Sequence, residues 1–517
     1  MNFSSIIELK DLLINSTNHL PEQSQFEGAA NGIFLLQEAY NLNITDLTRG
    51  VIKVKKMSEN SFLSSSSLKY QDTDFLGKIA YNRGFYDRAV DWFKAAAEIA
   101  GINTHDEKKN QSTIANNLVK TMIKTHDRVL EQKGPAGTIN GNSWRTNQVP
   151  FDEKLRKKKK YKNIIKGMKK VETGFQASLR PDNSEAVIWD QFNRLCRGEE
   201  LRPASLLKDL SCTLLHYHDP ALRLAPFKQE VISKIPFVTM FHHFLAESEI
   251  LHYKNFARTR LFRSSYGQSV NKGGMGTGVK RTSKQTWLYE FDNKQVLTLN
   301  NSLMSIGPYQ YRQDMAVLDQ VGLGVSDRIM KASRLYNAEH SGGESFQVAN
   351  YGIGGVYNHH PDPHNWHHPQ KTVSEDERPE AVMNGDRVAT VMGYLSDVEL
   401  GGATVFPNAG VTIWPERGSI AMWWNLVSNG LTDQMTIHGG CPVIVGSKWI
   451  TNKWIRWKPQ ELKLPCRSAN TGFTRQPELG NNLCEDGSNH LCRIDQQVFI
   501  RPNYYYESLK NFSPDFR

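Results

Sequence analysis

Four side chains in the second half of the chain have the types and spacing that iron chemistry needs. The segment YNHHPD contains His360 and Asp362, separated by one residue. The segment TIHGGCPVIVGSKW contains His438 and, ten residues later, Lys448. Two imidazoles and one carboxylate can occupy one face of a six-coordinate metal and leave the other positions open, which is the ligand set of non-haem Fe(II) oxygenases. The pattern therefore predicts an iron centre formed by His360, Asp362 and His438.

Each of these signals also has a plainer interpretation. A lone His-x-Asp pair occurs by chance in many proteins, and a lone lysine is most often solvated. A structural zinc site or a solvated polar loop is an alternative, because further histidines crowd the same loop, namely His359, His364, His367 and His368. The combination of a His-x-Asp pair, an apolar strand-rich block, a distal histidine and a following lysine favours the iron centre.

The secondary structure expected around these residues would bring them together. Residues i and i+2 of a strand point to the same face, so a His-x-Asp pair at a strand end directs both side chains toward one metal. Residues 432–438 are expected to form a distant strand that ends at His438, followed by a turn at GGCP. The run KWITNKWIRW alternates, which places Lys448 and Trp454 on one face of another strand.

Four longer segments surround these residues, namely FQVANYGIGGVY, RVATVMGYLSDVELGGATVFPNAG, VTIWPERGSIAMWWNL and TIHGGCPVIVGSKWITNKW. Together they resemble the catalytic part of the alpha subunit of collagen prolyl 4-hydroxylase, a 2-oxoglutarate dioxygenase. The resemblance extends over residues 188–466. It implies an α+β multidomain protein, with an N-terminal α-helical tetratricopeptide-like domain followed by a double-stranded β-helix (jelly-roll) catalytic domain.

The resemblance also implies roles for single residues. The three predicted ligands would bind Fe(II), and Lys448 would pair with the distal carboxylate of 2-oxoglutarate. Thr404 and Tyr351 match positions near this cosubstrate, and Trp454 matches a position near the proline of the peptide. The family implies L-ascorbate as a further cofactor.

The implied activity is hydroxylation of proline at C4 in X-Pro-Gly repeats of procollagen, with 2-oxoglutarate and O2 giving succinate and CO2. Hydroxyproline in these repeats serves the collagen triple helix. A hydroxylase of another proline-rich secreted protein is one alternative. A peptide-binding subunit with an impaired iron site is another, because His359 and Pro361 stand where the family usually has proline and an aromatic or apolar residue.

The region before the catalytic part is expected to be helical. Residues 74–100 match one tetratricopeptide-like helix pair, and residues 113–132 continue as an amphipathic helix. The resemblance makes this a peptide-substrate domain whose aromatic groove receives polyproline II segments. A plain helical hairpin with aromatics in its core is the alternative. The groove candidates are Tyr81, Phe85, Tyr86 and Trp92.

Four parts are expected along the 517 residues. Residues 1–60 form an N-terminal helical segment, interpreted as a truncated dimerisation region or linker. Residues 61–186 form the tetratricopeptide-like domain with a basic linker. Residues 187–466 form the dioxygenase domain, and residues 467–517 form a C-terminal tail without an assigned role.

The net charge of +10 suggests a basic surface without identifying a partner. The dense run KLRKKKKYK at residues 154–162 is expected to be a solvated linker or helix end rather than a nucleic-acid site. No uncharged apolar run approaches eighteen residues, so no membrane span is predicted.

The family acts in the lumen of the endoplasmic reticulum, and this is the expected location. The segment MNFSSIIELKDLL lacks the apolar core of a signal peptide, so the sequence is expected to begin inside a longer precursor. Acceptor sites for N-glycosylation favour a lumenal glycoprotein. They are Asn2, Asn15, Asn43, Asn110, Asn300 and Asn511.

Six cysteines suit an oxidising compartment. The resemblance implies a Cys441–Cys466 disulfide and a Cys196–Cys212 disulfide, with two unpaired buried thiols as the alternative for the second pair. The implied partner is protein disulfide isomerase, the beta subunit of the family's enzymes, and an alpha2-beta2 assembly is the arrangement that the family suggests.

Overall fold

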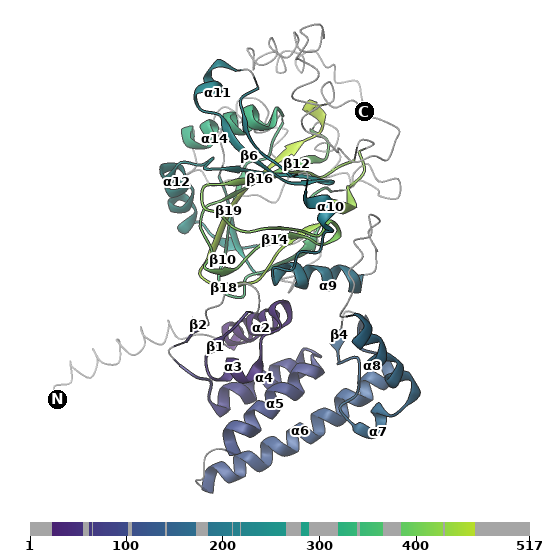
Figure 1. Ribbon diagram of the computed structural model, residues 1–517. Coiled ribbons are helices and arrows are strands. Elements are labelled where there is room, and N and C mark those ends of the chain that lie inside the picture. The colour runs from purple at the N-terminus through teal and green to yellow at the C-terminus, as the bar shows by residue number, and fades with distance from the viewer. Residues whose placement is uncertain are drawn as a thin grey trace, which may run out of the picture. The chain divides into compact units, whose positions relative to one another are not determined.

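The computed structural model describes residues 23–54, 62–64, 66–101, 106–139, 142–171, 185–208, 210–217, 219–264, 281–288, 319–338, 342–364, 384–427 and 430–460. The chain divides into two compact units. The helical unit comprises residues 1–176 with the short segments 196–199 and 353–355, and the sheet unit comprises residues 177–195, 200–352 and 356–517. In Figure 1 the helices of the helical unit run from purple to blue.

Helices form most of the helical unit. They are α2 Gln23–Tyr40, α3 Ile44–Thr48, α4 Tyr70–Asn82, α5 Tyr86–Gly101, α6 Asp106–Lys133, α7 Glu153–Arg156 and α8 Lys159–Val171. Two short antiparallel strand pairs accompany them, β1 Val51–Ile52 with β2 Phe62–Leu63 and β3 Ala136–Ile139 with β4 Asn142–Arg145. The helices expected at residues 74–100 and 113–132 are confirmed as α4, α5 and α6.

Helices α4 and α5 approach closely because Gly77 faces the ring of Phe93. A Cβ added at Gly77 would lie 2.9 Å from that ring, so any side chain there would push the two helices apart. Gly84 lies in the turn between them with φ of 76°, a conformation that glycine adopts without strain. The hairpin is therefore specified by small residues at the contact and at the turn.

The basic run at residues 154–162 forms α7 and the start of α8. The side chains of Lys157, Lys159 and Lys160 are exposed, and Lys158 pairs with Glu131 of α6 at 2.6 Å. Charges along this run are therefore carried on the surface of short helices.

The sheet unit contains the remaining strands. They are β5 Cys212–Leu215, β6 Phe227–Lys234, β7 Phe237–His242, β8 Phe262–Arg263, β9 Lys284–Leu288, β10 Phe346–Tyr351, β11 Tyr357–His360, β12 Arg387–Tyr394, β13 Leu400–Gly401, β14 Thr404–Phe406, β15 Val411–Ile413, β16 Ile420–Trp424, β17 His438–Gly440, β18 Val443–Val445 and β19 Lys448–Arg456. Its helices are α9 Glu185–Cys196, α10 Ala204–Leu207, α11 Pro220–Leu224, α12 Glu247–Arg258 and α14 Gln320–Ser333, with short 3-10 helices at η2 Pro407–Ala409, η3 Gln434–Thr436 and η4 Lys458–Gln460.

Antiparallel pairing joins these strands into one large and two smaller sheets. The large sheet has the order β5-β6-β7-β16-β12-β19-β10-β9-β8, and the second sheet has the order β11-β17-β14-β15. Strands β13 and β18 form a separate pair. Strand neighbours are often distant in sequence, so both sheets depend on long-range pairing.

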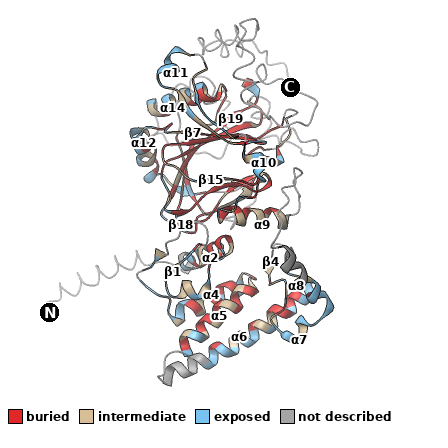
Figure 2. Ribbon diagram, viewed as in Figure 1, coloured by how far each residue is buried: buried red, intermediate tan, exposed pale blue. Residues whose placement is uncertain are grey.

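The two faces of the large sheet are buried by different partners. On one face, Tyr253 of α12 and Ile329 of α14 pack with Val348 and Trp424 of the sheet. On the other face, strand residues pack with Phe406 and neighbouring apolar residues of the second sheet. Figure 2 shows the resulting burial along the strands between α12 and α9. The space between the two sheets is therefore the interior in which a site can be shielded from water.

The approach to His438 differs from the expected strand. Residues Gln434–Thr436 form η3, because the side chain of Asp433 accepts a hydrogen bond from the Met435 N–H at 2.9 Å and starts a tight turn. His438 begins β17 rather than ending a strand, and the two glycines after it continue β17 rather than forming a turn.

The predicted Cys196–Cys212 disulfide is wrong. Cys212 is a free cysteine on the exposed strand β5, whereas Cys196 is buried at the end of α9 and is disulfide-bonded. Cys441 is also disulfide-bonded. Its expected partner, Cys466, lies outside the described residues, so the Cys441–Cys466 pairing stays a prediction.

A helical N-terminal part precedes a sheet-rich C-terminal part, which confirms the expected α+β organisation. The four-part division of the chain stays a prediction, and the tail at residues 467–517 lies outside the described residues. Within the described ranges, every helix is too short or too polar to cross a membrane.

Candidate active site

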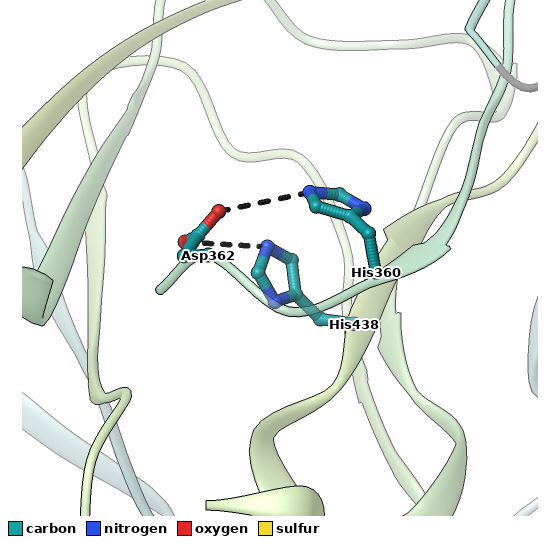
Figure 3. A group of neighbouring side chains, drawn as sticks. All are labelled: His360, Asp362 and His438. Atoms are coloured by element: carbon teal, nitrogen blue, oxygen red, sulfur yellow. Dashed lines mark ion pairs between the residues drawn. The ribbon is translucent and has the colours of Figure 1, made fainter. Parts of the chain in front are cut away.

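The structure brings His360, Asp362 and His438 together between the two sheets. His360 ends β11 and His438 begins β17, and these residues are direct partners across the antiparallel pair. The Nε2 atom of His360 lies 3.6 Å from Asp362 Oδ1, and that of His438 lies 3.6 Å from Oδ2. Figure 3 shows the three side chains pointing toward one another. All are buried, and one donor atom of each lies within 4.8 Å of the others, so one metal ion could bind all three.

Backbone carbonyls orient both imidazoles. The Nδ1 atom of His360 lies 2.8 Å from the carbonyl oxygen of Asn358, and that of His438 lies 3.0 Å from the carbonyl oxygen of Thr436. A carbonyl can only accept a hydrogen bond, so each Nδ1 carries a proton, and in the neutral tautomer with that proton each Nε2 presents its lone pair. The donor set is therefore arranged for a metal.

Close packing fixes the position of His360. A Cβ on Gly439 would lie 2.7 Å from the Tyr357 carbonyl oxygen and 2.8 Å from the ring of Phe192 in α9, so glycine is needed for β11 and β17 to meet. The Tyr357 ring stacks on His360 with 3.6 Å between ring centroids. The Arg281 guanidinium lies 4.6 Å from the Tyr357 ring centroid. The imidazole is thus held by its strand and by a stacked aromatic.

The electrostatics suit metal binding. Burial, together with the neighbouring His438, lowers the pKa of His360 to about 3, so this imidazole is neutral. Burial by itself would raise the pKa of Asp362, but the neighbouring histidines, the Arg387 charge and a hydrogen bond from Thr390 outweigh it and lower that pKa. A neutral imidazole and an ionised carboxylate are the forms that coordinate metals. The residues present therefore fit Fe(II).

Lys448 is a buried cation on the same sheet face. Its side chain is 3% exposed, and its Nζ donates to Thr404 Oγ1 at 3.0 Å. The Tyr394 hydroxyl donates to the same oxygen at 3.2 Å. Burial lowers the pKa of Lys448 to about 7. Among the described residues no carboxylate pairs with this ammonium, so an acidic ligand would complete it.

The ammonium lies at a defined place relative to the metal ligands. Its Nζ lies 3.8 Å from the position that a Cβ of Gly440 would take. Gly440 is two residues beyond His438 on β17, and residues two apart in a strand are separated by about 7 Å. This separation is comparable to the length of a five-carbon dicarboxylate such as 2-oxoglutarate.

Tyr351 and Trp454 line the same sheet face at its two ends. Tyr351 is the direct cross-strand partner of Lys448, and Trp454 is the partner of Thr390. Cross-strand partners share a face, so the expected placement of Lys448 and Trp454 on one face is confirmed. Because Thr390 contacts Asp362, Trp454 lies on the metal side of the sheet.

A buried ion network, which the sequence analysis missed, supports the metal loop. Arg387 donates to both carboxylate oxygens of Glu344 at 2.5 and 2.6 Å, and Arg456 donates to the same carboxylate at 2.8 Å. Arg387 also donates to the Asp362 carbonyl oxygen at 3.2 Å and lies 3.9 Å from the centroid of the Trp454 ring. The two arginines and the glutamate lie far apart in the sequence. Nothing in the sequence distinguishes them from charged residues at the surface.

Two further polar residues, Thr390 in β12 and Asn425 directly after β16, were also missed. Thr390 donates a 2.5 Å hydrogen bond to Asp362 Oδ2, and Asn425 donates a 2.8 Å hydrogen bond to Thr390. Both are 1% exposed. A signal was present, since each is an isolated hydrogen-bonding residue in a run of apolar ones, RVATVM and AMWWNL.

The neighbouring histidines take other roles. The His359 ring packs against Trp189 of α9 with 4.8 Å between centroids. Burial and two nearby arginines lower the pKa of His364 to about 4. His367 and His368 lie outside the described residues. Within the part of the chain that the structure describes, the His360, Asp362 and His438 group is the cluster that could hold a metal.

The aromatic groove candidates divide into surface and core residues. Tyr81 is 41% exposed, its ring lies 5.7 Å from that of Tyr86, and Tyr86 and Phe85 are partly buried. Trp92 is 0% exposed and donates to Gln37 from its indole nitrogen at 3.0 Å. Trp92 is therefore a core residue, and its expected place in the groove is wrong, because it lies on the inner side of α5.

Comparison with known proteins gives a consistent result. Residues 346–456 match the family described as the 2OG-Fe(II) oxygenase superfamily. The chain is 30% identical over 469 residues to prolyl 4-hydroxylase subunit alpha-1 of Mus musculus, which covers 87% of this chain and 77% of that protein. It is 29% identical over 485 residues to subunit alpha-2 of Gallus gallus, covering 89% and 81%. It is 29% identical over 476 residues to subunit alpha-3 of Homo sapiens, covering 90% and 79%.

Proposed function

This chain belongs to the family of prolyl 4-hydroxylase alpha subunits, and from that premise we propose that it hydroxylates proline at C4 in X-Pro-Gly repeats of procollagen-like chains. It is a dioxygenase that uses Fe(II) and 2-oxoglutarate. Bound iron supplies the oxidative decarboxylation of 2-oxoglutarate to succinate and CO2 and the coupled insertion of oxygen. The protein supplies binding, orientation and exclusion of water.

The observation that carries the proposal is the pairing of the metal-ligand group with the buried Lys448. A group of two imidazoles and one ionised carboxylate lies about two strand residues from an ammonium that no carboxylate among the described residues neutralises. A ligand that reaches both must chelate a metal at one end and carry an anion at the other. 2-Oxoglutarate has this chemistry.

Each side chain has a proposed role in that arrangement. His360, Asp362 and His438 bind iron, and Lys448 binds the far carboxylate. Thr404 receives its hydrogen bonds from Lys448 and Tyr394, so its own proton is free to be donated to the same carboxylate.

The remaining residues of the proposed site contact the organic substrates. Tyr351 lines the cosubstrate end beside Lys448. Trp454 lies on the metal side and offers an aromatic face to the proline ring of the peptide, with Arg387 on that indole. The proposed placement puts cosubstrate and peptide at opposite ends of β19.

The finer fold assignments belong to the same proposal. The two facing antiparallel sheets support a jelly-roll catalytic domain, and the α4–α5 hairpin supports a tetratricopeptide-like domain. Tyr81, Phe85 and Tyr86 then form an aromatic surface for polyproline II segments. Such a surface favours a long repetitive substrate.

The proposed partner is protein disulfide isomerase, the proposed location is the lumen of the endoplasmic reticulum, and L-ascorbate is the proposed further cofactor. Disulfide bonds at Cys196 and Cys441 support an oxidising compartment. An alpha2-beta2 assembly is the arrangement suggested by the family.

The experiment is 2-oxoglutarate decarboxylation by the full chain co-expressed with protein disulfide isomerase, with Fe(II) and ascorbate, with and without a Pro-Pro-Gly repeat peptide. We expect turnover to be stimulated by the peptide, and a mass gain of one oxygen on proline. Turnover with a different proline-rich peptide only would identify another secreted substrate. A folded, iron-loaded complex that binds the peptide without turnover would reject the hydroxylase in favour of a peptide-binding subunit.

A further inference from the structure

We propose that Thr390 and Asn425 form a positioning relay that keeps Asp362 a one-oxygen ligand of the metal. The proposal rests on the metal site of the proposed function and not on its peptide substrate. It concerns two residues that are each 1% exposed. Their hydrogen bonds end on Asp362, the one ligand of the three that can bind a metal through either one or two atoms.

The variable quantity is how many oxygens of Asp362 reach the metal. Oδ1 faces His360 and Oδ2 faces His438, each at 3.6 Å, so either oxygen or both could coordinate. With one oxygen, the protein would supply three ligands to a six-coordinate metal, which would leave two positions for 2-oxoglutarate and one for O2. With two oxygens, the protein would supply four ligands, and no position would be left for O2.

The relay acts on one oxygen only. Thr390 Oγ1 lies 2.5 Å from Asp362 Oδ2, and a hydrogen bond to an ionised carboxylate in a water-free interior is of the strong class. This bond draws Oδ2 toward β12 and occupies one of its lone pairs. Oδ1, which receives no hydrogen bond from a described residue, remains as the metal ligand.

Asn425 fixes the direction of the Thr390 hydroxyl. A hydroxyl has one proton, and the Asn425 amide donates to its oxygen at 2.8 Å. The opposite amide orientation would make Thr390 donate to Asn425 as well as to Asp362, which one proton cannot do. The proton of Thr390 is therefore committed to the carboxylate.

The backbone of Asn425 is held on both sides. Its N–H donates to the Val388 carbonyl oxygen at 2.8 Å, and its carbonyl oxygen accepts from the Asp433 N–H at 2.9 Å. Asp433 also starts η3, the turn that leads to His438. The relay thus joins β12, the end of β16 and the segment that presents the third ligand.

The test compares Thr390→Val, which keeps the shape without the hydroxyl, with Thr390→Ser, which keeps the hydroxyl. The matched control is Thr451→Val, because Thr451 is a buried threonine on the neighbouring strand β19 whose hydroxyl has no hydrogen-bond partner among the described residues. Each variant of the full chain is co-expressed with protein disulfide isomerase. We measure the Mn(II) dissociation constant, the 2-oxoglutarate dissociation constant of the Mn(II) protein, turnover, and the two Asp362 oxygen–metal distances in crystals with Mn(II).

For Thr390→Val we expect both carboxylate oxygens within coordination distance of Mn(II), about 10- to 100-fold lower kcat, and 2-oxoglutarate affinity within about threefold of wild type. Thr390→Ser restores the single-oxygen geometry and most of kcat, and Thr451→Val matches wild type in every readout. A Thr390→Val protein that binds Mn(II) through one oxygen of Asp362 would overturn the proposal.

A second variant serves if Thr390→Val does not fold. Asn425→Leu leaves the Thr390 hydroxyl free to rotate, and we expect a mixture of one- and two-oxygen binding with a smaller loss of kcat. Wild-type geometry and kcat in Asn425→Leu would overturn the relay. A further outcome is a wild-type protein that binds Mn(II) and decarboxylates 2-oxoglutarate in the Fe(II) form and yet leaves the peptide unmodified. This result would refute only the proposed peptide hydroxylation, because the oxygen–Mn(II) distances test the relay separately.

Discussion

Replacing Lys448 with methionine tests the cosubstrate site without a large change in side-chain volume. The Lys448 ammonium is buried, and its direct contacts among the described residues are the Thr404 hydroxyl and the Tyr394 ring. In Lys448→Met, a bound 2-oxoglutarate would place its far carboxylate in the same interior with no cation. Breaking a buried ion pair costs about 3–5 kcal/mol. At about 1.4 kcal/mol for each factor of ten, the 2-oxoglutarate Kd should rise by about two to three and a half powers of ten.

Although Lys448→Met should weaken the binding of 2-oxoglutarate, it should not destabilise the ligand-free protein. Burial lowers the pKa of Lys448 to about 7, below its ordinary value of 10.5, so the unfolded chain binds more protons than the folded chain between these two pH values. The free energy of unfolding of the wild type therefore increases with pH across this interval. Lys448→Met removes this contribution, so the variant should be as stable as the wild type or more stable near neutral pH.

The assays are calorimetric titration of the metal-loaded protein with 2-oxoglutarate, and urea unfolding of the ligand-free protein from about pH 7 to about pH 10. The matched control is Lys453→Met, because Lys453 is a second buried lysine of β19 that lies 4.7 Å from the Phe346 ring centroid on the other sheet face. We expect the 2-oxoglutarate Kd of Lys453→Met to equal that of the wild type. Equal loss of affinity in both variants, or a Kd for Lys448→Met within about threefold of wild type, would refute the reasoning.

Three other sets of substitutions distinguish the roles of residues that the sequence alone did not distinguish. His360→Ala should abolish turnover and Mn(II) binding, whereas His359→Ala should retain most of both, since the His359 ring packs on α9; equal loss would mean that the wrong histidine was assigned. Burial by itself would lower the pKa of the partly exposed His242, but Glu416 and Glu230 outweigh it and raise that pKa, so this contact contributes stability at low pH that is lost as pH rises through the raised pKa. His242→Gln should remove that pH dependence in urea unfolding, and a profile parallel to that of the wild type would contradict this. Trp92→Ala should lower the free energy of unfolding by about 3–5 kcal/mol because it empties a buried site, whereas Tyr81→Ala should cost less than about 1 kcal/mol and weaken binding of a polyproline peptide. Similar stability losses for these two variants would argue against the division into core and surface aromatics.

Local chemistry made the metal ligands predictable from sequence. The spacing of His360 and Asp362 predicted two ligands at the end of a strand, and β11 does end at His360, with Asp362 two residues beyond it. The need for a distant histidine follows from the coordination number of the metal. The alternation after Lys448 likewise predicted that Lys448 and Trp454 share a face, because side chains alternate in any regular strand. These inferences depend on covalent geometry and ligand chemistry, which the sequence determines directly.

The remaining features depend on which distant segments meet. Trp92 and Tyr81 are both aromatic residues of the α4–α5 hairpin, and only packing decides that one is core and the other surface. The bond between Thr390 and Asp362 and the Arg387–Glu344 pair each join a residue of β12 to a loop residue at least 28 positions away in the sequence, so no local period reveals them. A sequence specifies which groups could interact, whereas long-range strand pairing decides which groups do, because the register of each pair sets the neighbours of every buried side chain.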